Sequence, residues 1–327
     1  MPKNIHDSLA SCVGNTPLVR LDRCFPDSNR EVLAKLEMLN PAGSMKDRPA
    51  RFIIEHGLKN GILRPGMRLV ESTSGNLGIA LATMTRLYGL HFTAVVDPKT
   101  TPTNLRLLTT VGADVEMVTE PDQHGGYLGT RVAKAKQLAS EGSDTVWVNQ
   151  YANELNWRSY YETIGVELIQ ALEQAHTSVD YLVAPVSTSG SILGLSRRLR
   201  ERFPHLQVIA VDAVGSVIFG TPAGPREIPG YGASRVPEIL EPSEIDRVVH
   251  VNDLQAAAGC RRLVATEGIL AGGSSGAAIA AIDLVIDELP AGSRVVTLLP
   301  DRGERYLDMV FDDDWLAGVG ALQNADD

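Results

Sequence analysis

A single lysine, Lys46, stands in the stretch NPAGSMKDRPA, residues 40–50, among small and turn-forming residues. A lysine amine attacks carbonyl carbons once it has lost its proton, and burial or a neighbouring cation lowers its pKa toward that state. A lysine in a polar loop is ordinarily a solvated charge, and composition alone favours that interpretation. Lys46 is therefore a candidate for covalent chemistry only if other residues supply the groups that such chemistry needs.

Three further stretches combine glycine, serine and threonine, and each is predicted to run from a strand through a loop into a helix. They are ESTSGNLG at residues 71–78, PVSTSGSILG at 185–194 and LAGGSSGAAIAA at 270–281. The start of a helix exposes unpaired N–H groups and carries partial positive charge, so each loop could hold a phosphate or a carboxylate. Ordinary N-capping by serine, threonine or asparagine is the alternative for any one loop alone. Together with Lys46, the loops offer what pyridoxal phosphate needs: an amine, an anion-binding loop and a partner for its ring nitrogen.

The elements that must position these residues alternate along the chain. Short β-branched runs predict strands that begin near Val32, Arg68, His91, Asp114, Thr145, Tyr181, Gln207, Arg247 and Arg294. Helical patterns lie between them, among them the runs that begin at Asn76 and Ser159, where apolar residues recur at three- and four-residue steps. This alternation predicts an α/β fold of parallel sheets with helices on both faces, whose ligands bind at the carboxyl ends of the strands.

Length, charge and cysteine usage limit the class of protein. The 327 residues suffice for roughly two domains. The formal net charge of −10 argues against nucleic acid or an anionic membrane surface as the main partner. The three cysteines, Cys12, Cys24 and Cys260, show no CxxC spacing, so neither a disulfide framework nor a metal site is expected. The chain shows no signal sequence and no run long enough to span a membrane, which predicts a cytoplasmic protein.

Five motifs occur in an order that resembles the cysteine synthase and cystathionine beta-synthase family of fold-type II pyridoxal-phosphate enzymes. They are GNTPLVRL (14–21), NPAGSMKDR (40–48), TSGNLGIALA (73–82), GILAGGSSGAA (268–278) and DRGERYLD (301–308). The resemblance runs from about Leu9 to Leu316 and implies two three-layer αβα domains with mostly parallel sheets, as in the tryptophan synthase β subunit. It assigns residues 40–150 to a smaller, mobile domain for the substrate carboxylate and residues 1–39 with 151–316 to a larger cofactor domain. It also implies a homodimer with amino-acid substrates, and residues 317–327 are left as a loosely ordered acidic tail.

The same resemblance assigns roles position by position. Lys46 matches the lysine that binds pyridoxal 5'-phosphate as a Schiff base, Asn76 the asparagine at the cofactor's ring hydroxyl, and Ser274 the serine that faces its ring nitrogen. The phosphate-binding loop matches Ser187, Thr188, Ser189, Gly190 and Ser191. The groups that bind the substrate's α-carboxylate match Thr73, Ser74, Asn76 and Gln150. A serine does not keep the ring nitrogen protonated, so a long-lived carbanion is disfavoured and quick loss of a β-leaving group is favoured. Lys46 is expected to remove the α-proton, and a nucleophile then adds to the β-carbon of the resulting aminoacrylate.

Several positions depart from the plain cysteine synthases, whose phosphate loop is usually GTGGT where this chain has STSGS, and Leu77 replaces a frequent hydroxyl residue. The variants resemble a siderophore-pathway branch that joins O-phospho-L-serine to L-glutamate, giving N-(2-amino-2-carboxyethyl)-L-glutamate, a precursor of 2,3-diaminopropionate. In that branch residues matching Arg131 and Tyr151 help select phosphoserine, which suits a dianionic leaving group because a guanidinium binds two oxygens at once. A second acidic substrate needs a second cation, for which Arg235 is the candidate.

Each of these three residues has an ordinary alternative. Arg131 could lie on a solvated helix face, Tyr151 could be a packing residue, and Arg235 could pair with Glu238 at the surface. The function has alternatives as well, because the motifs shared by the whole family do not separate these reactions. They are a cysteine synthase that uses O-acetylserine or O-phosphoserine with sulfide, a serine or threonine dehydratase, and a catalytically silent cofactor-binding protein.

Overall fold

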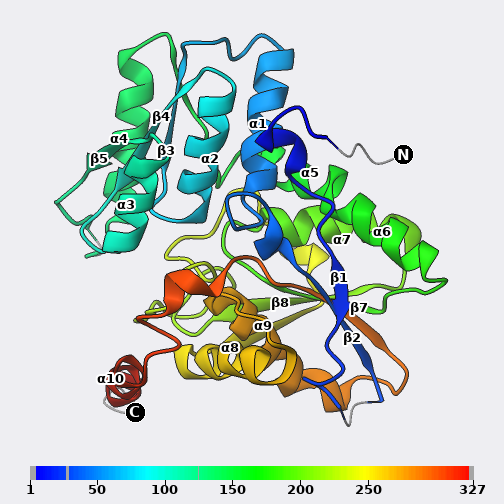
Figure 1. Cartoon of the computed structure of the whole chain (residues 1–327). Coiled ribbons are helices and arrows are strands. Elements are labelled where there is room, and N and C mark those ends of the chain that lie inside the picture. The colour runs from blue at the N-terminus through cyan, green and yellow to red at the C-terminus, as the bar shows by residue number, and fades with distance from the viewer. Residues whose placement is uncertain (1–4, 27–28, 124, 324–327) are drawn as a thin grey trace. The chain divides into compact units, whose positions relative to one another are not determined.

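The computed structural model describes residues 5–26, 29–123 and 125–323, and the chain forms two compact units. The first unit consists of residues 1–14 and 40–159, and the second of residues 15–39 and 160–327 (Figure 1). The family resemblance implies a division in which residues 1–39 belong to one domain and the other domain ends at residue 150. The N-terminal segment instead counts with the first unit because Ala10 and Val13 are buried in that unit's hydrophobic core.

The first unit is built on a four-stranded, all-parallel sheet with the strand order β5-β4-β3-β6. Its strands are β3 (Arg68–Ser72), β4 (His91–Val96), β5 (Asp114–Met117) and β6 (Thr145–Trp147). Its helices are α1 (Asp47–Lys59), α2 (Asn76–Leu87), α3 (Pro102–Thr110) and α4 (Leu128–Glu141). The first unit is therefore an α/β layer structure of the predicted kind.

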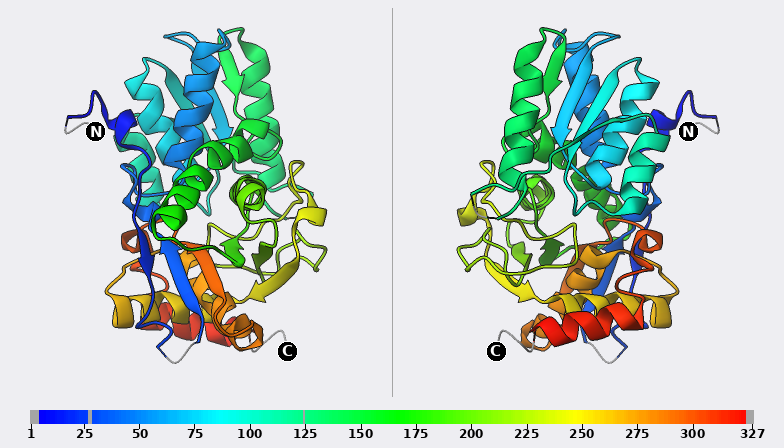
Figure 2. Two further views of the ribbon diagram at one scale, coloured as in Figure 1. Left: turned by 90° about the vertical axis from the view of Figure 1, so that its right-hand side faces the viewer. Right: turned by 90° about the vertical axis from the view of Figure 1, so that its left-hand side faces the viewer.

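Alternating side chains cover both faces of this sheet. Leu69 and Phe92 join the core formed with α1 and α2, whereas Val70 and Val95 pack against Ala135 of α4 on the opposite face. Figure 2 shows α4 on one side of these strands and α1 and α2 on the other. The carboxyl ends of β3 and β6 lead directly into segments that carry predicted substrate-binding residues.

The second unit is built on a six-stranded sheet with the order β1-β2-β10-β7-β8-β9. Its strands are β1 (Leu18–Arg20), β2 (Glu31–Lys35), β7 (Tyr181–Pro185), β8 (Gln207–Ala213), β9 (Arg247–Val251) and β10 (Arg294–Leu298). All neighbours run parallel except β1 and β2, so both sheets of the chain are mostly parallel. The short edge strand β1 was not expected from the sequence.

Helices cover both faces of the second sheet. They are α6 (Ile164–Gln174), α7 (Gly190–Arg202), α8 (Asp253–Glu267) and α9 (Gly273–Val285). One core joins α8 and α9 to strand residues such as Val183 and Ile209, and α7 packs against β7 and β8 from the other face. Helices α8 and α9 lie side by side (Figure 1) because Gly259 and Gly276 leave no side chain between them. A Cβ added at Gly276 would lie 2.0 Å from the carbonyl oxygen of Ala256.

Three local predictions were wrong. The helical run from Ser159 is two helices, α5 (Glu154–Glu162) and α6, because Thr163 between them has φ −121° and ψ −83°. The glycine-rich stretch from Leu270 follows a helix and not a strand, since α8 ends at Gly268 in the left-handed conformation. The presumed tail forms helix α10 (Asp313–Gln323), with two acidic residues in its first turn; residues 324–327 lie outside the described chain.

Short 3-10 turns complete the chain: η1 (Leu9–Cys12), η2 (Glu37–Leu39), η3 (Pro242–Glu244), η4 (Ile286–Glu288) and η5 (Gly303–Tyr306). The three cysteines are free thiols, of which Cys24 and Cys260 are buried. Among the described helices, none combines the length and the apolar character that crossing a membrane requires.

Candidate active site

The loop after β3 carries three of the four residues predicted to bind a carboxylate. The Thr73 hydroxyl accepts a hydrogen bond from the Gly78 N–H at 3.1 Å and so caps the third residue of α2. The loop folds this tightly because Gly78 has no side chain: a Cβ there would lie 3.0 Å from Thr73 Cγ2. Asn76 is the first residue of α2 and is half-buried, as is Ser74. The first N–H groups of α2 have no partner within the helix, which makes this loop suited to an anion.

Arg131 of α4 reaches this loop. Its Nη1 lies 3.2 Å from the hydroxyl oxygen of Ser74 and 3.2 Å from Asp97 Oδ2, and its side chain is 15% exposed. Its Nε is buried and has no hydrogen-bond partner within the part of the chain that the structure describes. The alternative of a solvated helix face is therefore wrong. Asp97, which also accepts the Lys99 N–H at 2.8 Å, holds the guanidinium beside the predicted carboxylate loop.

Gln150 joins the loop from the end of β6. Asn149 before it adopts φ 51°, a left-handed conformation that asparagine tolerates better than most residues. The Gln150 amide nitrogen lies 3.2 Å from the carbonyl oxygen of Ser72 and 3.5 Å from Oε1 of Glu71. The structure thus brings Gln150, Ser74 and Arg131 to one end of a single sheet.

Lys46 and Tyr151 belong to the same unit. Lys46 precedes α1 as its N-cap residue and is half-buried, and its N–H lies 3.2 Å from the Ser44 hydroxyl. The loop before it is held by Asp47, whose carboxylate accepts the Ala42 N–H at 2.6 Å. Tyr151 is 8% exposed, so its side chain is part of the interior of the protein. Lys46 is therefore placed by a fixed backbone and not by a loose surface loop.

The second unit carries the predicted phosphate loop between β7 and α7. Ser189 adopts φ 67° and ψ −10° at the N-cap of α7, a conformation that costs energy for a residue with a Cβ. Its hydroxyl is buried and finds no hydrogen-bond partner among the described residues. A left-handed residue before a helix start turns successive N–H groups toward one point, which is the geometry of an anion-binding nest. An unpaired buried hydroxyl beside such N–H groups fits a phosphate.

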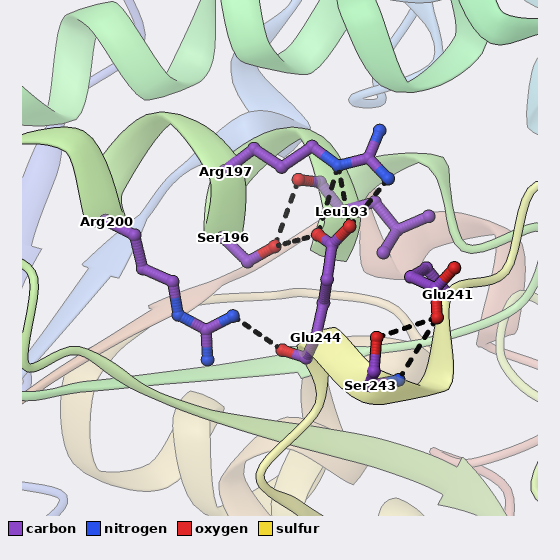
Figure 3. Close-up of polar contacts among 7 residues, drawn as sticks. All are labelled: Leu193, Ser196, Arg197, Arg200, Glu241, Ser243 and Glu244. Atoms are coloured by element: carbon purple, nitrogen blue, oxygen red, sulfur yellow. Dashed lines mark hydrogen bonds and ion pairs between the residues drawn. The ribbon is translucent and has the colours of Figure 1, made fainter.

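The far half of α7 is anchored by an ion pair and hydrogen bonds to the segment around η3 (Figure 3). Arg197 binds Glu244 of η3 through Nη2 at 2.7 Å and Nε at 3.0 Å, and Arg200 donates to the Glu244 carbonyl oxygen at 2.8 Å. Ser196 lies 3.4 Å from the same carboxylate. The contacts fix α7 against the segment 241–246, so the N-terminus of α7 is presented by a rigid element.

Ser274 is the second residue of α9 and is 3% exposed. Gly230 approaches it closely, since a Cβ at Gly230 would lie 3.7 Å from the Ser274 hydroxyl oxygen and 3.8 Å from the Tyr306 oxygen. The segment with Gly230 also touches the phosphate loop, because the Gly232 N–H donates to the Val186 carbonyl oxygen at 2.7 Å. The second unit thus collects Ser274 and the loop 187–191 around one segment.

The motif DRGERY supports the Ser274 turn, a role that the sequence did not reveal. The Gly272 N–H donates to the Asp301 carbonyl oxygen at 3.0 Å, and Tyr306 donates to Asp301 Oδ2 at 2.7 Å. Burial and the Asp301 carboxylate raise the pKa of Tyr306, which keeps it a neutral donor. The Gly303 N–H donates to the Leu270 carbonyl oxygen at 3.1 Å.

Arg235, the predicted cation for a second substrate, lies in the second unit and forms an ion pair with Glu238; its side chain is 31% exposed. The surface pair named as its alternative is therefore present. The other predicted residues fall into two sets: Lys46, Thr73, Ser74, Asn76, Arg131, Gln150 and Tyr151 in the first unit, and Ser187, Thr188, Ser189, Gly190, Ser191 and Ser274 in the second.

Comparison with known proteins establishes the family. The family model described as "Pyridoxal-phosphate dependent enzyme" matches residues 9–301, and the chain belongs to this family. Its cofactor is accordingly pyridoxal phosphate, and its fold is that of the cysteine synthase-like fold-type II enzymes. The buried Ser189 hydroxyl, which has no hydrogen-bond partner among the described residues, fits the phosphate of that cofactor.

Solved structures of three related enzymes match nearly the whole chain. An O-acetylserine dependent cystathionine beta-synthase from Helicobacter pylori is 33% identical, with a TM-score of 0.86 over 93% of this chain and 98% of that one. An O-ureido-L-serine synthase is 31% identical, with a TM-score of 0.86 over 96% and 99%. A hydrogen sulfide-producing enzyme from Fusobacterium nucleatum is 29% identical, with a TM-score of 0.85 over 93% and 100%.

Proposed function

We propose that this enzyme catalyses a β-replacement that joins O-phospho-L-serine and L-glutamate into N-(2-amino-2-carboxyethyl)-L-glutamate and phosphate. The bond between the β-carbon of serine and the phosphate oxygen breaks, and a bond from the same carbon to the glutamate nitrogen forms. The glutamate amine loses one proton, and the α-proton of the serine unit is removed and later returned. The related enzymes support the reaction class, since the names of two of them refer to serine-derived substrates or products.

The roles of the residues in this reaction follow from their positions. When bound, pyridoxal phosphate withdraws electrons and makes the α-proton of an amino acid removable. Lys46 Nζ would hold the cofactor and then take up that proton. Residues 187–191 and the N-terminus of α7 would bind its phosphate, Ser274 would face its ring nitrogen and Asn76 its ring hydroxyl. Thr73, Ser74, Asn76 and Gln150 would orient the substrate carboxylate.

The observation that carries the choice of donor is the place of Arg131. A mostly buried guanidinium, held by Asp97, lies in hydrogen-bond contact with Ser74 in the proposed carboxylate loop. A phosphate leaving group bears two negative charges and gains from a fixed, forked donor, whereas an acetyl group needs none. The Nε of Arg131 has no hydrogen-bond partner among the described residues, so Asp97 and Ser74 do not use all the donors of this guanidinium. We propose that Tyr151, on the same unit, helps to shape this leaving-group site.

The donor assignment is tested by replacing Arg131 with lysine, which keeps the charge and removes the fork. We expect the KM for O-phospho-L-serine to rise by about tenfold to a hundredfold, which is roughly 1.4–3 kcal/mol, and the KM for O-acetyl-L-serine to change far less. Arg106→Lys on the exposed face of α3 is the matched control. Equal losses for the two donors would remove the argument for phosphoserine.

For the acceptor we propose that Arg235 binds a carboxylate of glutamate and exchanges Glu238 for the substrate. An exposed arginine pair is worth little, so the exchange costs little. Arg235→Ala should raise the KM for glutamate and leave that for the serine donor unchanged. Glu238→Gln should lower the KM for glutamate, because it removes the competing carboxylate; an unchanged KM in both variants would exclude Arg235 as the acceptor site.

A cysteine synthase that uses sulfide is the second candidate. It is favoured by the 33% identity to an O-acetylserine dependent enzyme and by the Asp97 carboxylate, which offsets part of the charge of Arg131. Sulfide is small and carries no carboxylate, so its use would not depend on Arg235. The two candidates differ in the product: a carbon–nitrogen adduct of glutamate, or cysteine.

We further propose that the enzyme works as a cytoplasmic homodimer and that the segment 40–150 moves when substrate binds. Lids of this kind exclude water from a reactive intermediate, which would suppress the dehydratase reaction. Sedimentation of the purified enzyme tests the dimer. Comparison of amide exchange with and without substrate tests the movement, and protection restricted to the second unit would contradict it.

A further inference from the structure

Glu71 is a buried carboxyl that the proposed reaction does not use. It is the fourth residue of β3, its exposure is 0%, and it immediately precedes the loop with Thr73 and Ser74. Its Oε2 is buried and has no hydrogen-bond partner among the described residues, while its Oε1 lies 3.5 Å from the amide nitrogen of Gln150. Burying a carboxyl oxygen that forms no hydrogen bond destabilises the folded state, so such a group in a native protein requires an explanation.

Amide groups surround Glu71, and it forms no ion pair with any residue that the structure describes. Leu69, two residues earlier in β3, faces α1 and α2, and Glu71 shares that side because strand side chains alternate. The titratable groups at the start of α1 are Asp47, whose carboxylate accepts the Ala42 N–H, and the buried Arg48. Across the sheet, Arg131 of α4 is paired with Asp97 after β4.

Burial dominates the electrostatics of this carboxyl. It raises the pKa of Glu71 from 4.5 to about 8, against the smaller opposing effect of hydrogen bonds from Gln150, Asn149 and Ser72. Glu71 is therefore mostly protonated at neutral pH and ionises at the alkaline edge of the range in which enzymes are assayed. Its charge state can change while the rest of the loop stays the same.

We infer that Glu71 is a positioning residue that holds the side-chain amide of Gln150 and must be neutral when Gln150 binds a substrate carboxylate. The inference rests on the proposed role of Gln150 and extends it. Acceptors on β3, Glu71 Oε1 and the Ser72 carbonyl oxygen, occupy the amide nitrogen. While these two acceptors hold the amide nitrogen, Gln150 cannot donate it to a carboxylate, so the amide nitrogen must turn away from β3 to bind the substrate.

The protonation state of Glu71 decides how easily the amide nitrogen is released. A neutral carboxyl holds an amide by an ordinary hydrogen bond, whereas an ionised carboxylate forms a charge-assisted bond roughly twice as strong. An ionised Glu71 would also place a negative charge in the sheet next to the substrate's own carboxylate. Both effects weaken the binding of any amino acid once Glu71 has lost its proton.

The test measures the binding of L-alanine to the holoenzyme from about pH 6.5 to 9.5 by titration calorimetry. L-Alanine has the α-carboxylate and no leaving group, so the result does not depend on whether phosphoserine is the true donor. The variant is Glu71→Gln, which stays neutral at every pH. The matched control is Glu116→Gln. It removes a half-buried carboxylate from β5 of the same sheet, where Glu116 pairs with Lys134 of α4.

We expect the ratio of the Kd of the wild type to that of Glu71→Gln to rise about tenfold between pH 7 and pH 9, because the wild-type enzyme loses its affinity for L-alanine as Glu71 ionises. The pH dependence of the ligand's own amine is common to both proteins and cancels in the ratio. The Glu116→Gln ratio should stay flat. In a Gln150→Ala background the effect of Glu71→Gln should shrink, because Glu71 acts through Gln150.

A flat ratio for Glu71→Gln would overturn the inference, as would an undiminished effect in the Gln150→Ala background. Infrared spectroscopy of the wild type gives a second readout that needs no variant. The band of a protonated carboxyl should fade as pH rises through about 8 and reappear when L-alanine is added. If the enzyme does not react with O-phospho-L-serine but its affinity for L-alanine still depends on pH as expected, the proposed donor is wrong and the inference about Glu71 is retained.

Discussion

Replacing Glu71 with glutamine should change how the stability of the enzyme depends on pH. A carboxyl whose pKa is raised by burial binds its proton more tightly in the folded state than in the unfolded chain. Between the ordinary pKa of 4.5 and the folded value of about 8, the folded state carries the extra proton. The free energy of unfolding therefore falls as pH rises through this window, and above it the folded state must bury a charge.

The size of the effect follows from the same two pKa values. At 1.36 kcal/mol per pKa unit, the difference between 4.5 and about 8 corresponds to about 5 kcal/mol lost by the wild type across the window. Glutamine keeps the shape and an acceptor oxygen but has no proton to lose, so Glu71→Gln lacks this loss. Its stability relative to the wild type should rise by about 5 kcal/mol from pH 4.5 to pH 8.

Scanning calorimetry of both holoenzymes at a series of pH values tests this expectation. With about 2 °C in Tm for each kcal/mol, the Tm difference between variant and wild type should grow by about 10 °C across the window. Glu116→Gln removes a half-buried carboxylate from the same sheet and should show no such trend. A Tm difference that stays constant with pH would refute the claim that Glu71 is protonated in the folded enzyme at neutral pH.

Three further predictions concern packing, the cofactor and the donor. Gly276→Ala should destabilise the enzyme by about 3 kcal/mol or more, because the added Cβ would clash with the Ala256 carbonyl oxygen. The control Gly318→Ala, in α10 where a Cβ meets no other atom, should stabilise the enzyme slightly, and the Tm measures both changes. Ser189→Gly should relieve backbone strain and raise Tm in the apoenzyme while it weakens cofactor binding, measured by equilibrium dialysis; tighter binding would contradict the phosphate role of the hydroxyl. Arg131→Ala should abolish any preference for O-phospho-L-serine over O-acetyl-L-serine in competition assays, and a retained preference would contradict its role.

The sequence predicts most of the framework because local patterns encode it. All nine expected strands are present, since each is a short β-branched run bounded by turn residues. The edge strand β1 is three residues long and is defined by its pairing with β2, which no local pattern shows. The glycine-rich stretch from Leu270 was misread because helix α8, and not a strand, leads into it.

The parts of the candidate site that lie in contiguous sequence motifs could be predicted from the sequence. The loops at residues 73–76 and 187–191 are read directly from the sequence, and the structure places both at helix starts. The contact of Arg131 with Asp97 and Ser74 joins segments far apart in the chain, so only folding reveals it. Glu71 had one signal, an acid within the strand RLVES, but its burial depends on α1 and α2 covering that face.

The central claim is that O-phospho-L-serine and L-glutamate are joined, and the most direct measurement is phosphate release by the purified holoenzyme. The assay contains O-phospho-L-serine with glutamate, with sulfide or with neither, and mass spectrometry identifies the products. We predict release that depends on glutamate and an adduct with the mass of N-(2-amino-2-carboxyethyl)-L-glutamate. Release only with sulfide, with cysteine as the product, would contradict the claim and identify a cysteine synthase.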